Sequence, residues 1–302
     1  MKQQDQPIAI FDRVTKRYRR LRAVDEVTFS IAPGEVVGLV GDYESGKTTL
    51  MSMIMGFSRP SKGTIELFGH KVTSLTAHRV HRDIAYAAFD TTLPHIMTGE
   101  RYLRAVMAHR AAPAKQYDQL VRAFRPQLES KIGTLSSSNR QKIVLISAFL
   151  GLPKLIVLDE PMRELDPLSR EVLLDTMRDA SLRGATVVVS SQYPDEVARS
   201  CSRIIMLKDG AVVHDLSQQQ ITEYKGKNVT LYSDADIKLP LHAAKIRTGS
   251  QRKIKFSYTG DTQQLLQWIS ELKGIEDIAI EPRSLNDEFR HLYVTPEESD
   301  GE

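Results

Sequence analysis

The chain has 302 residues, of which 41% are hydrophobic and 26% are charged, an ordinary composition for a globular protein with room for more than one domain. Its formal net charge of +3 is too small to indicate nucleic acid as the main ligand, and its single cysteine excludes an internal disulfide. The most apolar stretch falls short of the roughly 20 residues that cross a bilayer, so the chain is not expected to span a membrane by itself.

The N-terminal part of the sequence predicts short strands separated by turns, followed by an α/β core. Continuous apolar runs flanked by helical patterns are typical of strands that are buried on both faces of a parallel sheet. A helix is expected to follow the first run, from Gly46 to about Met55. The three buried strands are predicted at residues 35–40, 155–161 and 186–192.

The spacing of apolar residues changes twice more along the chain. Residues about 90–150 are mostly helical in pattern and predict an inserted helical lobe. Beyond residue 217 the pattern becomes strand, strand, helix and strand, then a short helix and an acidic tail. We therefore predict one domain at residues 1–217 and a small α+β domain at residues 218–302. In the second domain, Trp268 is expected to fill the core.

A first motif, GDYESGKTT, matches G-x-x-x-x-G-K-[ST] between a predicted strand and a predicted helix. In that setting, successive backbone N–H groups and the helix N-terminus hold phosphates. Lys47 is expected to reach the outer phosphates of a nucleotide, and the Thr48 hydroxyl is expected to bind Mg²⁺. The predicted nucleotide-binding residues of this loop are Gly41, Glu44, Ser45, Gly46, Lys47, Thr48 and Thr49.

A second motif, LIVLDEP, is an apolar strand that ends in two adjacent carboxylates. Asp159 is expected to hold Mg²⁺ through water, and Glu160 is expected to polarise an attacking water molecule. Such a pair at a strand end is, alone, often only a turn. Its occurrence together with the phosphate loop indicates a nucleotide site.

With four further matched positions, these motifs resemble the ATP-binding-cassette (ABC) family over roughly residues 7–215. Tyr18 matches the aromatic residue that stacks on adenine. Ser136, in LSSSNRQ, stands in the family signature, Asp166 stands in the D-loop, and Gln192 stands where the switch histidine is expected.

The resemblance implies a P-loop NTPase core of the ABC type that binds ATP and Mg²⁺ and acts as an ATPase. Family members form head-to-tail dimers, in which each ATP lies between one phosphate loop and the signature of the partner. Glu160 and Gln192 would be the catalytic residues, while Tyr18, Ser136 and Asp166 would help to bind nucleotide.

The segment EPRSLNDEF near residue 285 resembles the C-terminal part of exporter ATPases that work with separate membrane subunits. The resemblance implies a multi-span membrane subunit and a second ABC subunit as partners, and no nucleic acid. It also implies a peripheral position on the cytoplasmic face of the cell membrane. The transported substrate is not expected to be encoded in this chain.

Four residues depart from the family pattern. Glu44 replaces a glycine of the phosphate loop, and Phe89 stands where a glutamine contacts Mg²⁺ and the attacking water. Gln192 replaces a histidine, and Ser138 replaces a glycine of the signature. The first three weaken this chain's own pocket, and Ser138 weakens the pocket of the subunit that it faces. The four changes indicate either a heterodimer with a second cassette subunit or a site that hydrolyses ATP slowly. Losing one preorganised phosphate contact costs about 100- to 1000-fold in rate.

Three other readings stay open. The subunit is an ordinary ATPase if the family tolerates these four changes. A regulatory subunit would sense ATP without driving transport, although such a sensor has no need of Glu160. A soluble cassette protein of translation or DNA repair usually has two cassettes or long coiled-coil insertions, and the sequence has neither.

Overall fold

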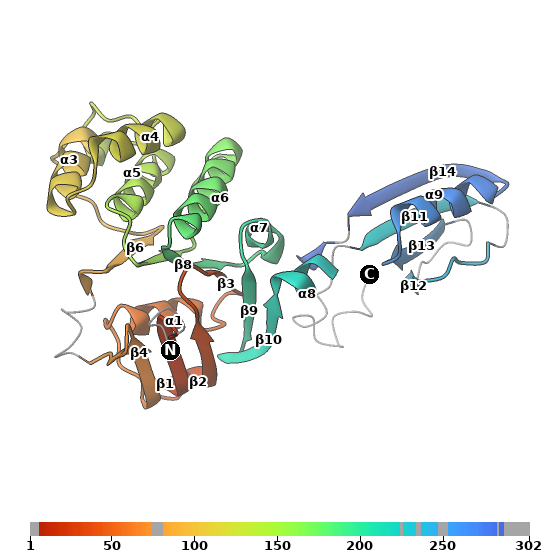
Figure 1. Ribbon diagram of the computed structural model, residues 1–302, viewed down its shortest axis with the longest axis horizontal. Helices are drawn as coiled ribbons and strands as arrows, with labels where there is room; N and C mark the ends of the chain where they lie inside the picture. The colour runs from red at the N-terminus through yellow and green to blue at the C-terminus, as the bar shows by residue number, and fades with distance from the viewer. Residues whose placement is uncertain are drawn as a thin grey trace. The chain divides into compact units, whose positions relative to one another are not determined.

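The structure is a computed structural model that describes residues 6–73, 81–223, 226–233, 237–246, 253–282 and 284–286. The chain divides into two units, Met1–Leu216 and Ser217–Glu302, which are described separately (Figure 1).

A six-stranded sheet forms the centre of the first unit, with strand order β10-β9-β3-β8-β7-β6. The strands from β9 to β6 along this order pair in parallel. Every residue of β3, β7 and β8 is buried, which confirms the prediction of three buried strands in an α/β core. The strands are β3 (Val36–Gly41), β6 (Ile84–Ala88), β7 (Leu155–Asp159), β8 (Thr186–Ser191), β9 (Arg203–Lys208) and β10 (Ala211–Ser217).

A second, antiparallel sheet with the order β2-β1-β4-β5 is formed mainly by the N-terminal strands. Helix α1 (Lys47–Ile54) contacts β2 and β4 of this sheet as well as β3 and β7 of the parallel sheet. Its Met51 and Ile54 are fully buried in one hydrophobic cluster with residues of both sheets. The helix that follows the phosphate loop is therefore anchored in the main core. The strands are β1 (Ala9–Tyr18), β2 (Leu21–Ile31), β4 (Lys62–Leu67) and β5 (His70–Lys71).

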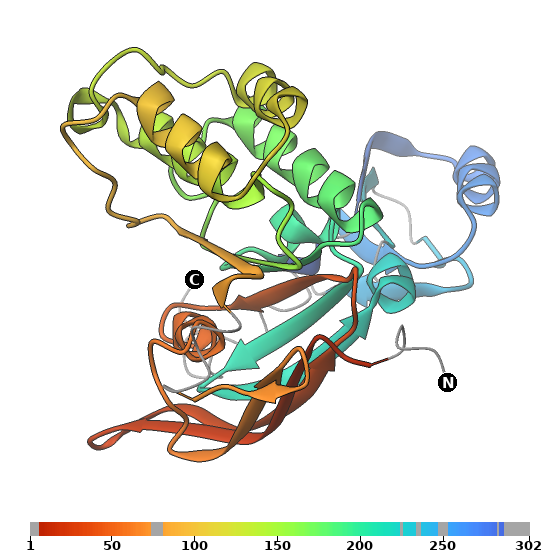
Figure 2. The same ribbon diagram turned by 60° about the vertical axis from the view of Figure 1, so that its left-hand side comes forward.

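Four helical segments lie between β6 and β7 in the sequence and group together beside the β6 edge of the sheet (Figures 1 and 2). Helix α5 contacts α3, α4 and β6, because nearly all of its apolar side chains are buried. None of the described helices is long and apolar enough to cross a membrane. The segments are α3 (Gly99–His109), α4 (Ala114–Phe124), the 3-10 helix η1 (Ile132–Thr134) and α5 (Ser137–Phe149).

Two helices on the C-terminal side of β7 complete the first unit. Helix α6 (Pro167–Leu182) follows β7 and contacts β8 and β3, and the short α7 (Pro194–Ala198) follows β8. Asp166 caps the N-terminus of α6, since its carboxylate accepts a 2.9 Å hydrogen bond from the Ser169 N–H.

The second unit contains a four-stranded antiparallel sheet with the order β12-β13-β11-β14, together with helix α9 (Thr262–Glu271). The Trp268 ring lies edge-on to Phe256, with 5.6 Å between ring centroids, which confirms Trp268 as part of the core. The acidic tail lies outside the described residues, as does most of the expected short helix after residue 282. The other elements are α8 (Gln218–Glu223), β11 (Lys227–Ser233), β12 (Ala243–Ile246), β13 (Lys253–Tyr258) and β14 (Ile275–Pro282).

Candidate nucleotide-binding site

The phosphate loop joins the end of β3 to the start of α1. A β-carbon on Gly41 would lie 2.4 Å from the Leu207 carbonyl oxygen, and one on Gly46 would lie 2.5 Å from that of Ala23. Gly46 also has φ 102°, a conformation that favours glycine, and no side chain caps the helix that begins after it. The uncapped first turn of α1 leaves backbone N–H groups for an anion, as a phosphate-binding loop requires.

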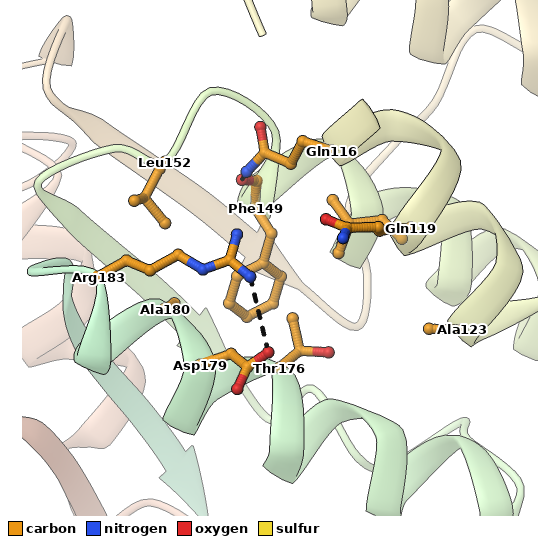
Figure 3. A pocket seen from close by; sticks show the side chains of 10 residues that line it. Gln116, Gln119, Ala123, Phe149, Leu152, Thr176, Asp179, Ala180 and Arg183 are labelled. Atoms are coloured by element: carbon orange, nitrogen blue, oxygen red, sulfur yellow. Dashed lines mark hydrogen bonds and ion pairs between the residues drawn. The ribbon is translucent and has the colours of Figure 1, made fainter. Parts of the chain in front are cut away.

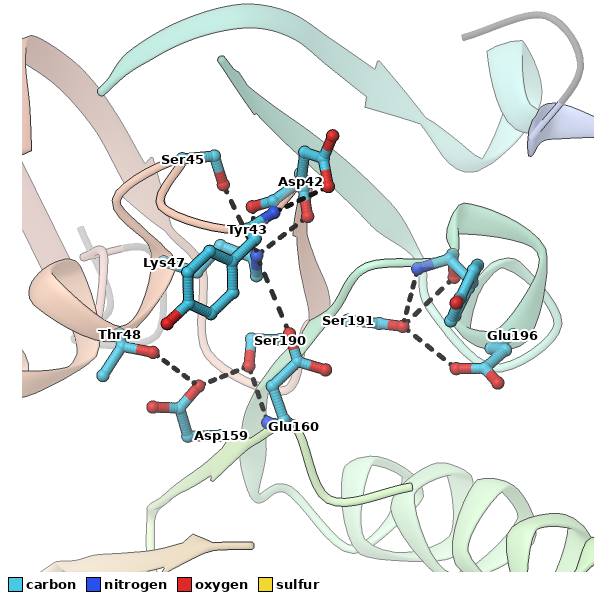
Figure 4. A network of polar contacts seen from close by, with 12 residues as sticks. Asp42, Tyr43, Ser45, Lys47, Thr48, Asp159, Glu160, Ser190, Ser191 and Glu196 are labelled. Carbon is cyan, nitrogen blue, oxygen red and sulfur yellow. Dashed lines mark hydrogen bonds and ion pairs between the residues drawn. The ribbon is translucent and has the colours of Figure 1, made fainter. Parts of the chain in front are cut away.

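Lys47 is folded against its own loop. Its ammonium donates hydrogen bonds of 2.8 Å to the carbonyl oxygens of Gly41 and Asp42, and lies 3.7 Å from Glu160 Oε1 (Figure 4). Only 6% of the Lys47 side chain is exposed. Burial lowers the pKa of Lys47 below its ordinary value, and the carboxylates of Glu160 and Asp159 offset part of that shift.

Asp159 lies at the end of β7, next to the hydroxyls of two other segments. The Thr48 hydroxyl donates to Asp159 Oδ1 at 3.3 Å, and the Ser190 hydroxyl donates to the same oxygen at 2.6 Å (Figure 4). Within the described ranges, no group of three or more His, Cys, Asp or Glu side chains is arranged to hold a metal. Thr48 and Asp159 instead fit Mg²⁺, which proteins commonly bind through one or two side chains together with phosphate oxygens.

Glu160 follows Asp159 in the left-handed backbone region, with φ 47°. Its N–H donates to the Ser190 hydroxyl at 2.7 Å, so Ser190 holds both carboxylate residues in place. Burial raises the pKa of Glu160, and Lys47 opposes this shift. A carboxylate with a raised pKa is a stronger base, which suits activation of a water molecule. Sequence reasoning missed Ser190, whose position at the end of β8 was its only signal.

The segment after β8 is tied to α6 by a polar network. The Ser191 hydroxyl donates to Glu196 Oε2 at 3.1 Å, and Arg170 Nη1 donates to Glu196 Oε1 at 2.9 Å. Gln192, which was expected in place of the switch histidine, is half-buried and follows Ser191 directly. The network therefore fixes the backbone from which Gln192 projects.

Two further departures from the family pattern, Glu44 and Phe89, lie in the phosphate loop and directly after β6. The Glu44 side chain is exposed, and its backbone has φ 61°. Phe89 follows the edge strand β6, where its N–H donates to the Asp159 carbonyl oxygen at 3.2 Å. The residue is 39% exposed, and the centroid of its ring lies 4.5 Å from the guanidinium carbon of Arg163, a contact that sequence reasoning did not find.

Tyr18 lies at the end of β1, in the antiparallel sheet. The residue is 47% exposed, with the Lys16 ammonium 4.9 Å from the ring centroid. Its hydroxyl lies 3.3 Å from Ser58 Oγ. An exposed ring on the antiparallel sheet is available for stacking, and this residue stays a predicted adenine contact.

The signature and the D-loop are linked through α5. The Ser136 hydroxyl caps this helix by accepting hydrogen bonds from the backbone and side chain of Asn139, at 3.3 and 3.1 Å. Lys142 forms a 2.9 Å ion pair with Asp166. This lysine, together with hydrogen bonds from Ser169, holds the pKa of Asp166 well below its usual range. In the described chain, Ser136 and Asp166 contact α5 and α6 but not the phosphate loop. The predicted site residues that the fold brings together are Lys47, Thr48, Asp159 and Glu160.

A separate cleft of about 250 Å³ lies between α4 and α6 (Figure 3). Its lining includes the apolar Phe149 and an ion pair in which Arg183 Nη2 lies 3.8 Å from Asp179 Oδ2. It contains none of the residues predicted to bind nucleotide. The candidate nucleotide site is therefore the phosphate loop with the ends of β7 and β8.

Curated relatives are ATP-binding subunits of transporters. The ABC transporter family matches residues 24–163. Nod factor export ATP-binding protein I of Burkholderia orbicola is 30% identical over 222 residues, covering 70% of this chain and 72% of that protein. The protein of the same name from Burkholderia lata is 27% identical over 301 residues, covering 95% and 97%. Phosphonates import ATP-binding protein PhnC of Rhizobium johnstonii is 28% identical and covers 72% and 84%.

Solved structures agree with the fold. The ATP-binding subunit of an ABC transporter has a TM-score of 0.64 and 27% identity, covering 70% of this chain and 90% of its own. A dimeric ATP-binding cassette bound to ADP and phosphate has a TM-score of 0.62 and 23% identity, covering 70% and 98%. These matches confirm the predicted P-loop NTPase core of the ABC type. With its phosphate loop, its carboxylate pair and these relatives, the chain belongs to the ABC transporter family as one of its ATP-binding subunits.

Proposed function

We propose that this chain is the nucleotide-binding subunit of an ABC exporter, that it binds ATP and Mg²⁺ at a dimer interface, and that its own site hydrolyses ATP slowly. The proteins named for Nod factor export support the exporter assignment. One of them matches 95% of this chain, which includes the C-terminal unit. The match to the phosphonate import protein covers 72% of this chain.

The residues that would hold the nucleotide are those that the fold brings together. The first turn of α1 offers backbone N–H groups to the phosphates, and Lys47 offers its buried ammonium. Thr48 and Asp159 would hold Mg²⁺, which neutralises developing charge on the phosphates when it is bound. Glu160 would accept a proton from the attacking water, and Ser190 positions its backbone.

The observation that carries slow hydrolysis is the position of Phe89. Phe89 follows β6, and its N–H is hydrogen-bonded to the carbonyl oxygen of Asp159, one of the two residues that would hold Mg²⁺. A phenyl ring has no atom that can bind a metal or orient a water molecule. Gln192 adds to this effect, because it keeps a hydrogen-bonding group but has no titratable ring.

The partners follow from the same substitutions. A homodimer would carry each of them twice, so we propose a heterodimer with a second ABC subunit. We also propose a multi-span membrane subunit that holds the pair on the cytoplasmic face of the membrane. The C-terminal unit, residues 218–302, is proposed as a separate domain of this subunit, next to a cassette domain at residues 1–217 with its helical lobe at about residues 90–150.

A regulatory subunit that binds ATP without driving transport is the second candidate. The ion pair between Lys47 and Glu160 favours it, because both groups are engaged with each other. The test is ATP hydrolysis by the chain purified with its membrane partner, as wild type, Lys47→Ala and Glu160→Gln. Fast turnover that both substitutions abolish would contradict slow hydrolysis at this site. Turnover that neither substitution changes, with ATP still bound, would support a nucleotide-holding subunit.

A further inference from the structure

An arginine is stacked on the phenylalanine that replaces the family's glutamine. The guanidinium carbon of Arg163 lies 4.5 Å from the centroid of the Phe89 ring, which is within the range of cation–π contacts. Arg163 is exposed, and it stands in the turn between Glu160 and α6. The two side chains come from segments more than 70 residues apart and meet at one end of the parallel sheet.

The backbones of both residues are fixed to the carboxylate pair. The Phe89 N–H donates to the Asp159 carbonyl oxygen at 3.2 Å, and the Arg163 N–H donates to the Glu160 carbonyl oxygen at 3.3 Å. The left-handed conformation of Glu160, with φ 47°, begins the turn that carries Arg163. The backbones of Phe89 and Arg163 are therefore held next to those of the residues that would contact magnesium and the attacking water.

The guanidinium has unused capacity for binding an anion. In the part of the chain that the structure describes, Arg163 makes no ion pair with a carboxylate. A phenyl ring attracts a cation but accepts no ordinary hydrogen bond, so the five N–H donors of Arg163 are not consumed by the stack. Arginine also stays charged at all physiological pH values.

We propose that Arg163 contacts the terminal phosphate of a nucleoside triphosphate held on this chain's phosphate loop, and that Phe89 is a positioning residue for it. The pair thus replaces a neutral glutamine with a cation at the same end of the sheet. Planar guanidinium groups pair well with phosphate oxygens, and arginines supply such contacts in other nucleotide hydrolases. This inference rests on the proposed binding of ATP by the chain.

The test compares the affinities of the chain for ATP and ADP, which differ in the terminal phosphate. Arg163→Ala is expected to weaken ATP binding about 10- to 100-fold, and to leave ADP binding unchanged. Arg163→Lys keeps the charge but lacks the planar fork of donors, so its affinity for ATP is expected to lie between those of wild type and Arg163→Ala. Arg122→Ala, which removes an exposed arginine from α4, is the matched control and should change neither affinity.

The role of Phe89 is tested by a double-mutant cycle. Phe89→Leu keeps an apolar side chain of similar size but removes the ring face, and it should weaken ATP binding less than Arg163→Ala does. In the Arg163→Ala background the same change should have no further effect, because a positioning residue acts only through the group that it positions. Additive effects of the two changes would overturn the positioning role.

The outcomes separate this inference from the proposed function. Wild type that binds ATP, with Lys47→Ala that does not, supports nucleotide binding by this loop. If Arg163→Ala then binds ATP as tightly as wild type, or loses ATP and ADP affinity equally, the phosphate contact is wrong while the proposed function stands. Wild type that binds neither nucleotide would overturn both. If Arg163→Ala binds both nucleotides as wild type does but no longer binds the membrane subunit, the arginine belongs to that interface and the proposed phosphate contact is wrong.

Discussion

The Lys47 ammonium lies 3.7 Å from Glu160 Oε1, so the lysine of the phosphate loop and the carboxylate that would activate water are paired with each other. Burial disfavours the charge on both, since it lowers the pKa of Lys47 and raises that of Glu160. The pair gives each charge a partner in a site where both are largely removed from water. Phosphates must compete with Glu160 for the lysine when they bind.

The first prediction concerns this competition. Glu160→Gln removes the carboxylate but keeps the size of the side chain, so Lys47 should turn to phosphate more readily. We expect ATP affinity to rise about three- to tenfold, which corresponds to the net value of one modest polar contact. Isothermal titration calorimetry would measure it, with Glu164→Gln in the same turn as the control. A fall in affinity would show that Glu160 assists nucleotide binding.

The second prediction is the pH dependence of stability. A carboxyl group whose pKa is raised by folding holds its proton more tightly in the folded state. Glu160 therefore costs no stability below its ordinary pKa of 4.5, and its cost grows as the pH rises through the raised value. The free energy of unfolding of wild type, minus that of Glu160→Gln, should fall as the pH rises above 4.5. Urea unfolding of both proteins at several pH values measures this difference, and a rise would contradict it.

The third prediction separates charge from backbone strain at Glu44. Glu44 has φ 61°, and non-glycine residues in this region carry about 1 kcal/mol or more of strain. Glu44→Gly should therefore increase the free energy of unfolding by about 1 kcal/mol, less any loss from the greater freedom of glycine in the unfolded chain. Glu44→Gln keeps the strain and removes the charge, so it should leave stability unchanged. Both variants should bind ATP more tightly if the carboxylate repels phosphate.

The fourth prediction concerns the cap of α6. Asp166→Ala removes the acceptor of the Ser169 N–H and the partner of Lys142, and should destabilise the protein by about 1 kcal/mol or more. Asp166→Asn keeps a good capping side chain and loses only the charge, so it should cost less than about 1 kcal/mol. Chemical denaturation measures both. Equal losses would show that the ion pair, and not the cap, stabilises this end of the helix.

Several elements were predictable because their cause is local. The strands β3, β7 and β8 can be predicted without knowing which strands pair with them, because a strand that is covered on both faces has few polar residues. The phosphate loop has fixed spacing for a similar reason, because its glycines avoid clashes with nearby backbone. By contrast, β12 is a four-residue strand without clear alternation, and its pairing with β13 defines it.

The parts of the site that sequence reasoning missed depend on which strands are neighbours. Ser190 reaches Asp159 because β8 pairs with β7, and Phe89 meets Arg163 because β6 pairs with β7. Serine at a strand end and arginine in a turn are both common on surfaces, so neither residue type carries a signal by itself. Motif spacing therefore predicts the main site residues, whereas the residues that contact them, Ser190 and Arg163, depend on the order of the strands in the sheet.

Helix α1 starts at a glycine, with no side chain closing its first turn, while its far end is buried in the main hydrophobic core. A phosphate at this position would complete the hydrogen bonding of the helix in the way that a capping side chain does elsewhere. A bound nucleotide would then stabilise the first unit of the chain, in addition to being the substrate of hydrolysis. Its departure would loosen the start of α1, so the amide hydrogens of that turn would report whether the subunit is loaded.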